Sequence, residues 1–73
     1  MSYHVISIPK CALCLMAKNL LTAHGLEYTE EILDTDKKRE AFKAANPTVK
    51  VMPQIYEDSV LVGSWSNLRA WLK

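Results

Sequence analysis

The change of hydrophobic period at Cys11 constrains the fold of this chain more than any other feature. The preceding residues, YHVISI at 3–8, are rich in β-branched and aromatic side chains and predict a short strand. From Cys11 onward the apolar residues follow a helical spacing, at Leu13, Met16, Ala17, Leu20 and Leu21. Gly25 predicts the end of this helix. The sequence therefore predicts a strand that leads directly into an amphipathic helix.

The middle of the chain repeats this strand–helix order. Residues 27–33 predict a second strand. The segment DTDKKREAFKAANP predicts a second helix, capped by Asp34, Thr35 or Asp36 and ended by Asn46-Pro47. In this helix we expect three residues to face inward, namely Ala41, Phe42 and Ala45.

The last third of the chain predicts a hairpin and a short helix. QIYE and VLVG flank Asp58-Ser59, a pattern that is typical of an antiparallel hairpin. The segment SNLRAWLK predicts a final helix with Ser64 or Ser66 as its cap. For the two tryptophans we expect Trp71 to pack in the core and Trp65 to lie at the rim of a groove.

The predicted order is β-α-β-α-β-β-α, which places the chain in the α/β class. The first crossover requires a parallel strand pair and the hairpin adds antiparallel strands. We therefore expect a mixed four-stranded sheet with three helices packed on its faces. A chain of 73 residues, 49% of them hydrophobic, predicts a single domain over residues 1–73.

Charge and hydropathy argue against two classes of partner. The net charge is +1 and both signs are spread along the chain, whereas a nucleic-acid footprint needs clustered Lys and Arg. No apolar run approaches the roughly 20 residues of a membrane span. The N-terminal segment lacks the pattern of a signal peptide. We expect a cytoplasmic protein (in the host cytoplasm, if the chain is encoded by a phage), where a purely structural disulfide is disfavoured.

The two cysteines, Cys11 and Cys14, form a CxxC pair at the predicted strand-to-helix junction. This placement indicates a thioredoxin-like redox motif. At the first turn of a helix the unpaired N–H groups and the helix dipole stabilise a thiolate, and Lys10 adds a positive charge. Such cysteines have pKa values of roughly 3.5–7.5. We expect Cys11 to be the exposed nucleophile and Cys14, one turn deeper, to resolve the mixed disulfide.

Other uses of the cysteines have less support in the sequence. A zinc site needs about four ligands. Only His4 and His24 could complete one, and they fall on different predicted elements. The pair could also be buried and inert. A third possibility is a non-catalytic binding module in which Trp65 and Trp71 form an exposed contact surface.

The chain resembles the glutaredoxin family over nearly its whole length. CALC at 11–14 is similar to the CPYC-type active site, and VMPQIY at 51–56 to the TVPQIF-type segment, in which the proline is cis. LVGSWSNLRAWL at 61–72 is similar to the glycine-containing turn and closing helix of the family. The resemblance implies a thioredoxin-like fold and a thiol–disulfide oxidoreductase. It is strongest to the short phage-type glutaredoxins, which implies ribonucleotide reductase, and so deoxyribonucleotide synthesis, as a use of the electrons.

The resemblance also implies a groove for glutathione, which would act as a co-substrate, with no tightly bound cofactor. On matching positions the groove beside Cys11 would comprise Lys10, Leu13, Val51, Met52, Pro53, Trp65, Ser66 and Asn67. The backbone of Met52 would pair with the tripeptide. Lys10 or Lys50 would attract its glycyl carboxylate. The implied partners are glutathione and disulfide-containing proteins, and the implied state is a monomer.

The sequence departs from the family pattern at several groove positions. The substitutions are Ala12-Leu13 for Pro-Tyr, Ile8 for a Lys or Arg, Val51 for Thr, Ser64 for Gly, and Asn67 for an Asp. They weaken the expectation of tight glutathione binding. One alternative therefore stays open, a redoxin that thioredoxin reductase reduces. A separate alternative is a dimeric carrier of an iron–sulfur cluster ligated by Cys11 and glutathione.

Overall fold

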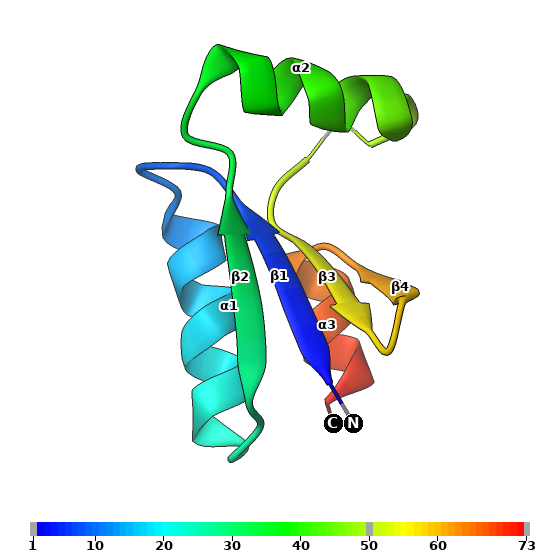
Figure 1. Cartoon of the computed structure of the whole chain (residues 1–73). Coiled ribbons are helices and arrows are strands. Elements are labelled where there is room, and N and C mark those ends of the chain that lie inside the picture. Colours follow the sequence, from blue (N-terminus) through cyan, green and yellow to red (C-terminus); the bar gives the residue numbers. More distant parts are fainter. Residues whose placement is uncertain (1, 50, 73) are drawn as a thin grey trace.

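The computed structural model describes residues 2–49 and 51–72. It has the predicted order of elements (Figure 1), with β1 at Tyr3–Ser7, α1 at Ala12–Ala23, β2 at Tyr28–Ile32, α2 at Asp36–Ala45, β3 at Gln54–Glu57, β4 at Val60–Gly63 and α3 at Trp65–Trp71. The predicted thioredoxin-like fold, a mixed four-stranded sheet with three helices, is confirmed.

The strands are arranged in the order β2-β1-β3-β4. β1 pairs with β2 in parallel through the α1 crossover, whereas β1–β3 and β3–β4 are antiparallel. Ile6 pairs with Gln54, so the end of β1 lies beside the start of β3. This register brings the segment before β3 next to the loop that carries the cysteines.

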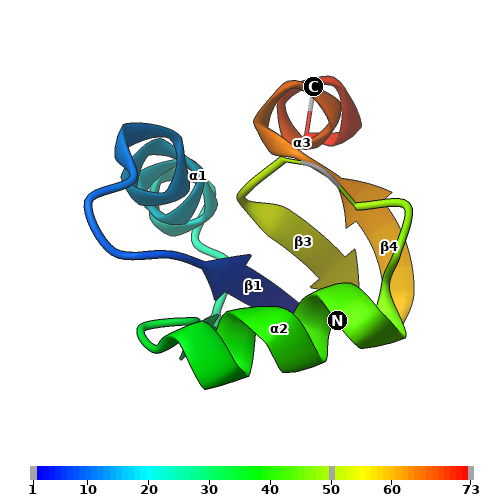
Figure 2. The same cartoon turned by 90° about the horizontal axis from the view of Figure 1, so that it is seen from above.

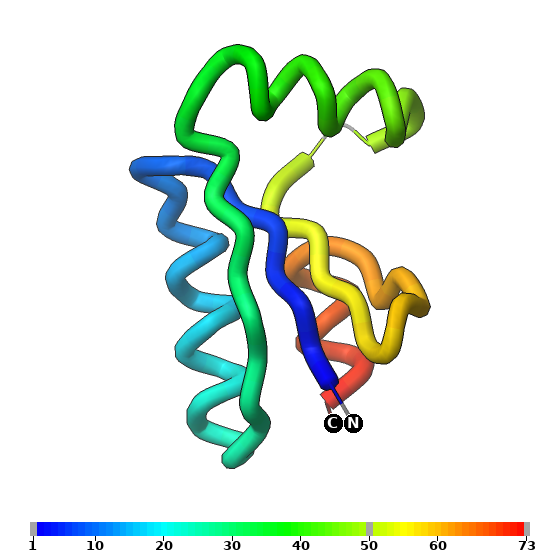
Figure 3. Tube along the Cα trace, in the orientation of Figure 1, coloured from blue at the N-terminus to red at the C-terminus, as the bar shows by residue number. Residues whose placement is uncertain are grey.

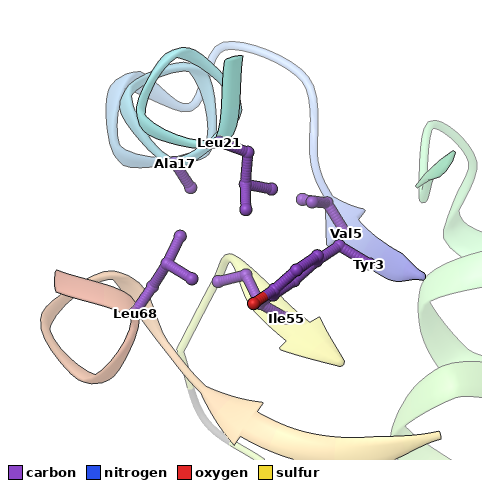
Figure 4. Packing of buried hydrophobic residues seen from close by; sticks show 6 residues of the cluster. All are labelled: Tyr3, Val5, Ala17, Leu21, Ile55 and Leu68. Atoms are coloured by element: carbon purple, nitrogen blue, oxygen red, sulfur yellow. The ribbon is translucent and has the colours of Figure 1, made fainter. Parts of the chain in front are cut away.

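α1 and α3 cover one face of the sheet (Figure 2). Between them and the strands lies a cluster of buried side chains (Figure 4), namely Tyr3, Val5, Ala17, Leu21, Ile55 and Leu68. Burial of each large apolar side chain contributes about 1.5–3 kcal/mol. The cluster therefore supports the two elements that begin at the candidate site, α1 and α3.

The buried face of α1 differs from the predicted one. Cys14, Ala17 and Leu21 are buried, whereas Leu13 and Met16 are 44% and 45% exposed. Apolar residues surround much of this helix, so the hydrophobic spacing alone does not fix which arc faces the sheet. Exposure of Leu13 and Met16 places apolar side chains at the surface near the cysteines.

α2 crosses the ends of the strands on the side opposite α1 and α3 (Figures 1 and 2), and the chain enters and leaves it through loops (Figure 3). None of its side chains is buried. The prediction that Ala41 and Ala45 face inward is wrong, and of the three residues expected to face inward Phe42 alone is partly buried. Thr35 caps the helix, because its Oγ1 accepts a hydrogen bond of 3.2 Å from the backbone N–H of Lys38.

The prediction for Trp71 is also wrong. Trp71 is 49% exposed, and its Nε1 donates a hydrogen bond to the hydroxyl of the buried Tyr3. The buried residue of α3 is Leu68, which belongs to the cluster. Trp65 is partly buried against the same cluster, and α3 begins after Ser64.

The start of β1 and the end of α3 lie away from the cysteine loop. β1 runs towards that loop, and α3 runs back in the opposite direction (Figure 1).

At the tip of the β3–β4 hairpin, Asp58 and Ser59 both have positive φ, +47° and +72°. Among residues 2–49 and 51–72, no helix is long and apolar enough to cross a membrane.

Candidate active site

The cysteine pair occupies the junction between β1 and α1. Cys11 is the N-cap of α1 and has extended backbone angles. The pair forms a disulfide, with the Cα atoms 5.3 Å apart. Cys14 is 2% exposed and Cys11 is partly exposed. The predicted difference in depth between the two cysteines is therefore present.

The sulfur of Cys11 lies at the amino end of α1. Its Sγ accepts a hydrogen bond of 3.1 Å from the backbone N–H of Cys14. The first N–H groups of a helix have no partner within the helix, so a side chain at the N-cap can satisfy one of them. The same N–H group and the helix dipole would stabilise negative charge on Sγ in the reduced protein.

Lys10 determines the direction in which the chain enters α1. Its φ is +57°, the left-handed region that non-glycine residues seldom adopt. The Lys10 side chain is exposed. Because Lys10 directly precedes Cys11, it adds a positive charge at the edge of the cysteine loop.

The segment before β3 forms the second wall of the site. The Met52–Pro53 peptide bond is cis, as the resemblance implies. Pro53 is buried, Met52 partly buried and Val51 55% exposed. Gln54 Nε2 donates a hydrogen bond of 2.8 Å to the Val51 carbonyl and holds the segment in place. The β1–β3 register places this wall beside the cysteine loop.

The start of α3 forms the third part of the predicted groove. The Asn67 Oδ1 accepts two hydrogen bonds from Ser64, 3.1 Å from its backbone N–H and 3.2 Å from its hydroxyl. Ser66 and Asn67 are exposed, and Trp65 packs against the guanidinium of Arg69, 5.8 Å from the ring centroid. Asn67 therefore uses its acceptor oxygen to cap its own helix.

Gly63 makes this cap possible. A Cβ at position 63 would lie 2.6 Å from Asn67 Oδ1, and the φ of Gly63 is +126°. Real Cβ atoms do not approach other atoms so closely. The glycine thus allows the close contact between the end of β4 and the first turn of α3.

A cavity beside the second wall combines predicted groove residues with cationic residues of α2 that the sequence analysis did not select. Its volume is about 300 Å³. It is lined by Ile8, Leu33, Arg39, Phe42, Lys43, Val49, Val51 and Met52. The i, i+4 spacing of Arg39 and Lys43 on α2 was the sequence pattern that could have indicated them. Lys50, the alternative cation for the glycyl carboxylate, lies outside the described residues.

A polar network that joins β1, β2 and α1 was also missed. The Ser7 hydroxyl donates a hydrogen bond of 2.6 Å to Glu30 Oε2, and Lys18 Nζ lies 2.8 Å from the same oxygen. Burial alone would raise the pKa of Glu30, but the hydrogen bonds from Lys18 and Ser7 and the charge of Lys18 outweigh it and lower that pKa. The carboxylate and the ammonium are therefore a charged pair at neutral pH.

Within the described residues, no group of three or more His, Cys, Asp or Glu side chains is placed to hold a metal ion. His4 hydrogen-bonds through Nδ1 with Thr29 on β2. His24 lies at the far end of α1 as its C-cap. The structure therefore does not bring these two histidines to the cysteines.

The family follows from this geometry together with the sequence match. The family model described as Glutaredoxin matches residues 3–62, which cover the cysteine pair, the cis-proline and most of the hairpin. The chain belongs to the glutaredoxin family. Glutaredoxins are thiol–disulfide oxidoreductases, and this member contains a disulfide-forming CxxC pair. No curated protein matches the chain by sequence.

Solved structures support the same fold. Glutaredoxin 1 from Francisella tularensis, complexed with cacodylate, matches with a TM-score of 0.82 at 21% identity, covering 94% of this chain and 88% of that one. A glutaredoxin from Brucella melitensis matches with a TM-score of 0.78 at 29% identity, covering 99% and 78%. A buckwheat glutaredoxin–glutathione complex matches with a TM-score of 0.82 at 22% identity, covering 93% and 64%.

Proposed function

We propose that this glutaredoxin is a glutathione-linked dithiol–disulfide oxidoreductase in which Cys11 is the nucleophile and Cys14 the resolving cysteine. The observation that carries the assignment is the hydrogen bond from the Cys14 N–H to Cys11 Sγ at the start of α1. This N–H group favours a thiolate on Cys11. The buried position of Cys14 leaves Cys11 as the sulfur that a substrate can reach.

The reaction follows in two exchange steps. The Cys11 thiolate attacks one sulfur of a substrate disulfide, which breaks the substrate S–S bond and releases the other sulfur as a thiolate that takes up a proton. Cys14 then loses its proton and attacks Cys11 Sγ. The second substrate sulfur leaves, and the Cys11–Cys14 disulfide forms. Two electrons have passed from the protein to the substrate. Two glutathione molecules then reduce the Cys11–Cys14 disulfide to the dithiol and become glutathione disulfide.

The groove residues have assigned places in this proposal. The glutathione would lie along Met52 and Pro53, with Leu13 on one side. Its γ-glutamyl end would face Trp65, Ser66 and Asn67. Lys10 would attract the glycyl carboxylate, and Val51 would lie beside it. The buckwheat relative is described as a complex with glutathione, which supports this class of ligand for the family. Ribonucleotide reductase and other cytoplasmic disulfide proteins are the proposed acceptors.

Two observations favour a second electron source. In the family pattern an acidic residue at position 67 pairs with the glutathione amino group, but here the only side-chain acceptor of Asn67 already binds Ser64 twice. Ile8, at a position that often carries a cation, contributes only apolar surface to the nearby cavity. Both features favour reduction by thioredoxin reductase as the alternative within the same chemistry.

The test is NADPH consumption with a small glutathione mixed disulfide, glutathione and glutathione reductase. We expect turnover that disappears in Cys11→Ser and persists in part in Cys14→Ser, because a single thiolate can exchange with a mixed disulfide. Turnover only after thioredoxin reductase replaces the glutathione system would support the second electron source. Full activity in both cysteine variants would contradict the proposal.

A further inference from the structure

The Ser7–Glu30–Lys18 network joins the end of β1 to β2 and to α1, at the helical turn that follows Cys14. Lys18 is four residues after Cys14 on α1, a spacing that puts two side chains on one helix face with Cβ atoms about 5–6 Å apart. Cys14 and Ser7 are each 2% exposed. The side chains of Lys18 and Glu30 are only 23% and 22% exposed. Solvent screens a pair at this depth less than it screens a pair on the open surface.

The network is electrically balanced in this chain. The Glu30 carboxylate accepts from both Ser7 and Lys18 at the same oxygen. The carboxylate and the ammonium therefore cancel, and the cysteines have a neutral background. Lys10, the charged residue that precedes Cys11, is exposed and is not part of this network.

The two redox states of the cysteines differ in charge. The disulfide is neutral, whereas the reduced pair carries a negative charge if Cys11 is a thiolate, as the proposed function requires. A net charge placed behind Cys14 therefore shifts the equilibrium between the two states. A positive charge favours the dithiol and a negative charge favours the disulfide.

We propose that the Glu30–Lys18 pair, held by Ser7, tunes the redox equilibrium of the Cys11–Cys14 couple by keeping the net charge behind Cys14 at zero. In this role Glu30 and Lys18 are positioning residues that touch neither substrate nor the reacting sulfurs. The inference rests on the proposed function only in requiring that Cys11 and Cys14 interconvert between dithiol and disulfide.

The experiment measures the equilibrium protein disulfide + 2 glutathione ⇌ protein dithiol + glutathione disulfide at pH 7 for the full chain. Glu30→Gln leaves Lys18 uncompensated, and we expect the constant to shift about threefold towards the dithiol. Lys18→Met leaves Glu30 uncompensated, and we expect a similar shift towards the disulfide. A threefold change corresponds to about 14 mV for a two-electron couple.

The double variant Lys18→Met/Glu30→Gln restores neutrality, so we expect its constant to lie within about twofold of the parent value. The matched control is Lys38→Met, which breaks the Lys38–Asp34 ion pair on the surface, where both side chains are more than half exposed. We expect no shift in this control, because solvent screens an exposed pair.

A purely structural role predicts a different result. The single variants would then lower the unfolding midpoint without moving the equilibrium in opposite directions, and this outcome would overturn the inference. Shifts of one sign in both variants, or shifts no larger than that of Lys38→Met, would overturn it equally. If the parent protein shows no dithiol–disulfide interconversion at all, the proposed function itself fails, so the two failures are distinguishable.

Discussion

At the scale of single residues, the site depends on a few backbone positions that bring side chains close together. Lys10 turns the chain into α1 with a φ of +57°, and Gly63 lets Asn67 approach the end of β4. Gly25 also has a positive φ, +69°, but no atom lies within 4 Å of the position of its Cβ. At Gly25 a side chain would therefore meet only backbone strain, whereas at Gly63 it would meet both backbone strain and a steric clash.

Gly63→Ala should lower the free energy of unfolding more than Gly25→Ala does. At Gly25 we expect a loss of about 1 kcal/mol, because only the left-handed backbone opposes a side chain. At Gly63 the added Cβ also displaces Asn67 from Ser64, and we expect about 2–3 kcal/mol. Urea unfolding of both variants measures this difference, and equal losses would contradict the steric argument.

At the scale of elements, the strands and helices differ in how firmly tertiary contacts hold them. α1 and α3 contribute Ala17, Leu21 and Leu68 to the buried cluster (Figure 4), whereas α2 has no buried side chain. α2 is held by the Thr35 cap and local ion pairs such as Arg39–Asp36. The stability of α2 therefore depends mainly on interactions within the helix and its cap.

We expect the backbone amides of α2 to exchange with solvent through local opening, and those of α1 only through much larger unfolding. Thr35→Ala should remove about 1 kcal/mol from α2 by loss of the cap. Hydrogen-exchange mass spectrometry should then show faster exchange over residues 36–45 and little change over residues 12–23. Uniform acceleration of both helices would show that α2 is part of the cooperative core.

The hairpin between β3 and β4 offers a stabilising substitution. Asp58 and Ser59 both adopt the positive φ that a type I′ turn requires, and glycine is favoured at the second position of that turn. We expect Ser59→Gly to raise the free energy of unfolding by about 0.5 kcal/mol. Thermal unfolding measures it.

The control for the hairpin is Asp58→Gly. The Asp58 Oδ1 accepts a hydrogen bond of 2.9 Å from the backbone N–H of Ser2, so this substitution loses a contact while it relieves the same strain. We expect Asp58→Gly to stabilise less than Ser59→Gly, or to destabilise. A larger gain at position 58 would mean that the Ser2 contact contributes nothing.

The sequence predicts the elements better than it predicts what each element buries. Strand and helix positions, the hairpin and the CxxC junction follow from local patterns of residues. The inward arc of α1, the exposure of Trp71 and the poor burial of α2 depend on how elements pack, which spacing does not specify. The Ser7–Glu30–Lys18 network joins three elements, so no local pattern reveals it.

At the scale of the whole molecule, Glu30 links the stability of the fold to pH. Its pKa is below the ordinary value of 4.5 in the folded protein because Lys18 and Ser7 outweigh the effect of burial. A lowered pKa contributes stability that is fully present above about pH 4.5 and is lost as the pH falls through the folded-state value. The fold should therefore weaken in mild acid.

We expect the free energy of unfolding to fall as the pH drops below about 5, and to fall less steeply in Glu30→Gln. Urea titrations at a series of pH values measure the two slopes. Asp34→Asn serves as the comparison, since Asp34 is exposed and pairs with Lys38 on the surface. Identical slopes in the parent and Glu30→Gln would show that other carboxylates carry the acid sensitivity.

The direction of β1 and α3 has a practical consequence for handling this protein. β1 begins and α3 ends at the side of the molecule away from the disulfide (Figure 1). A fluorescent reporter or a surface tether joined at either end would leave Cys11 open to solution. The fold is therefore suited to fused redox sensors and to immobilised reducing supports, in which the attachment and the exchanging sulfurs occupy opposite poles.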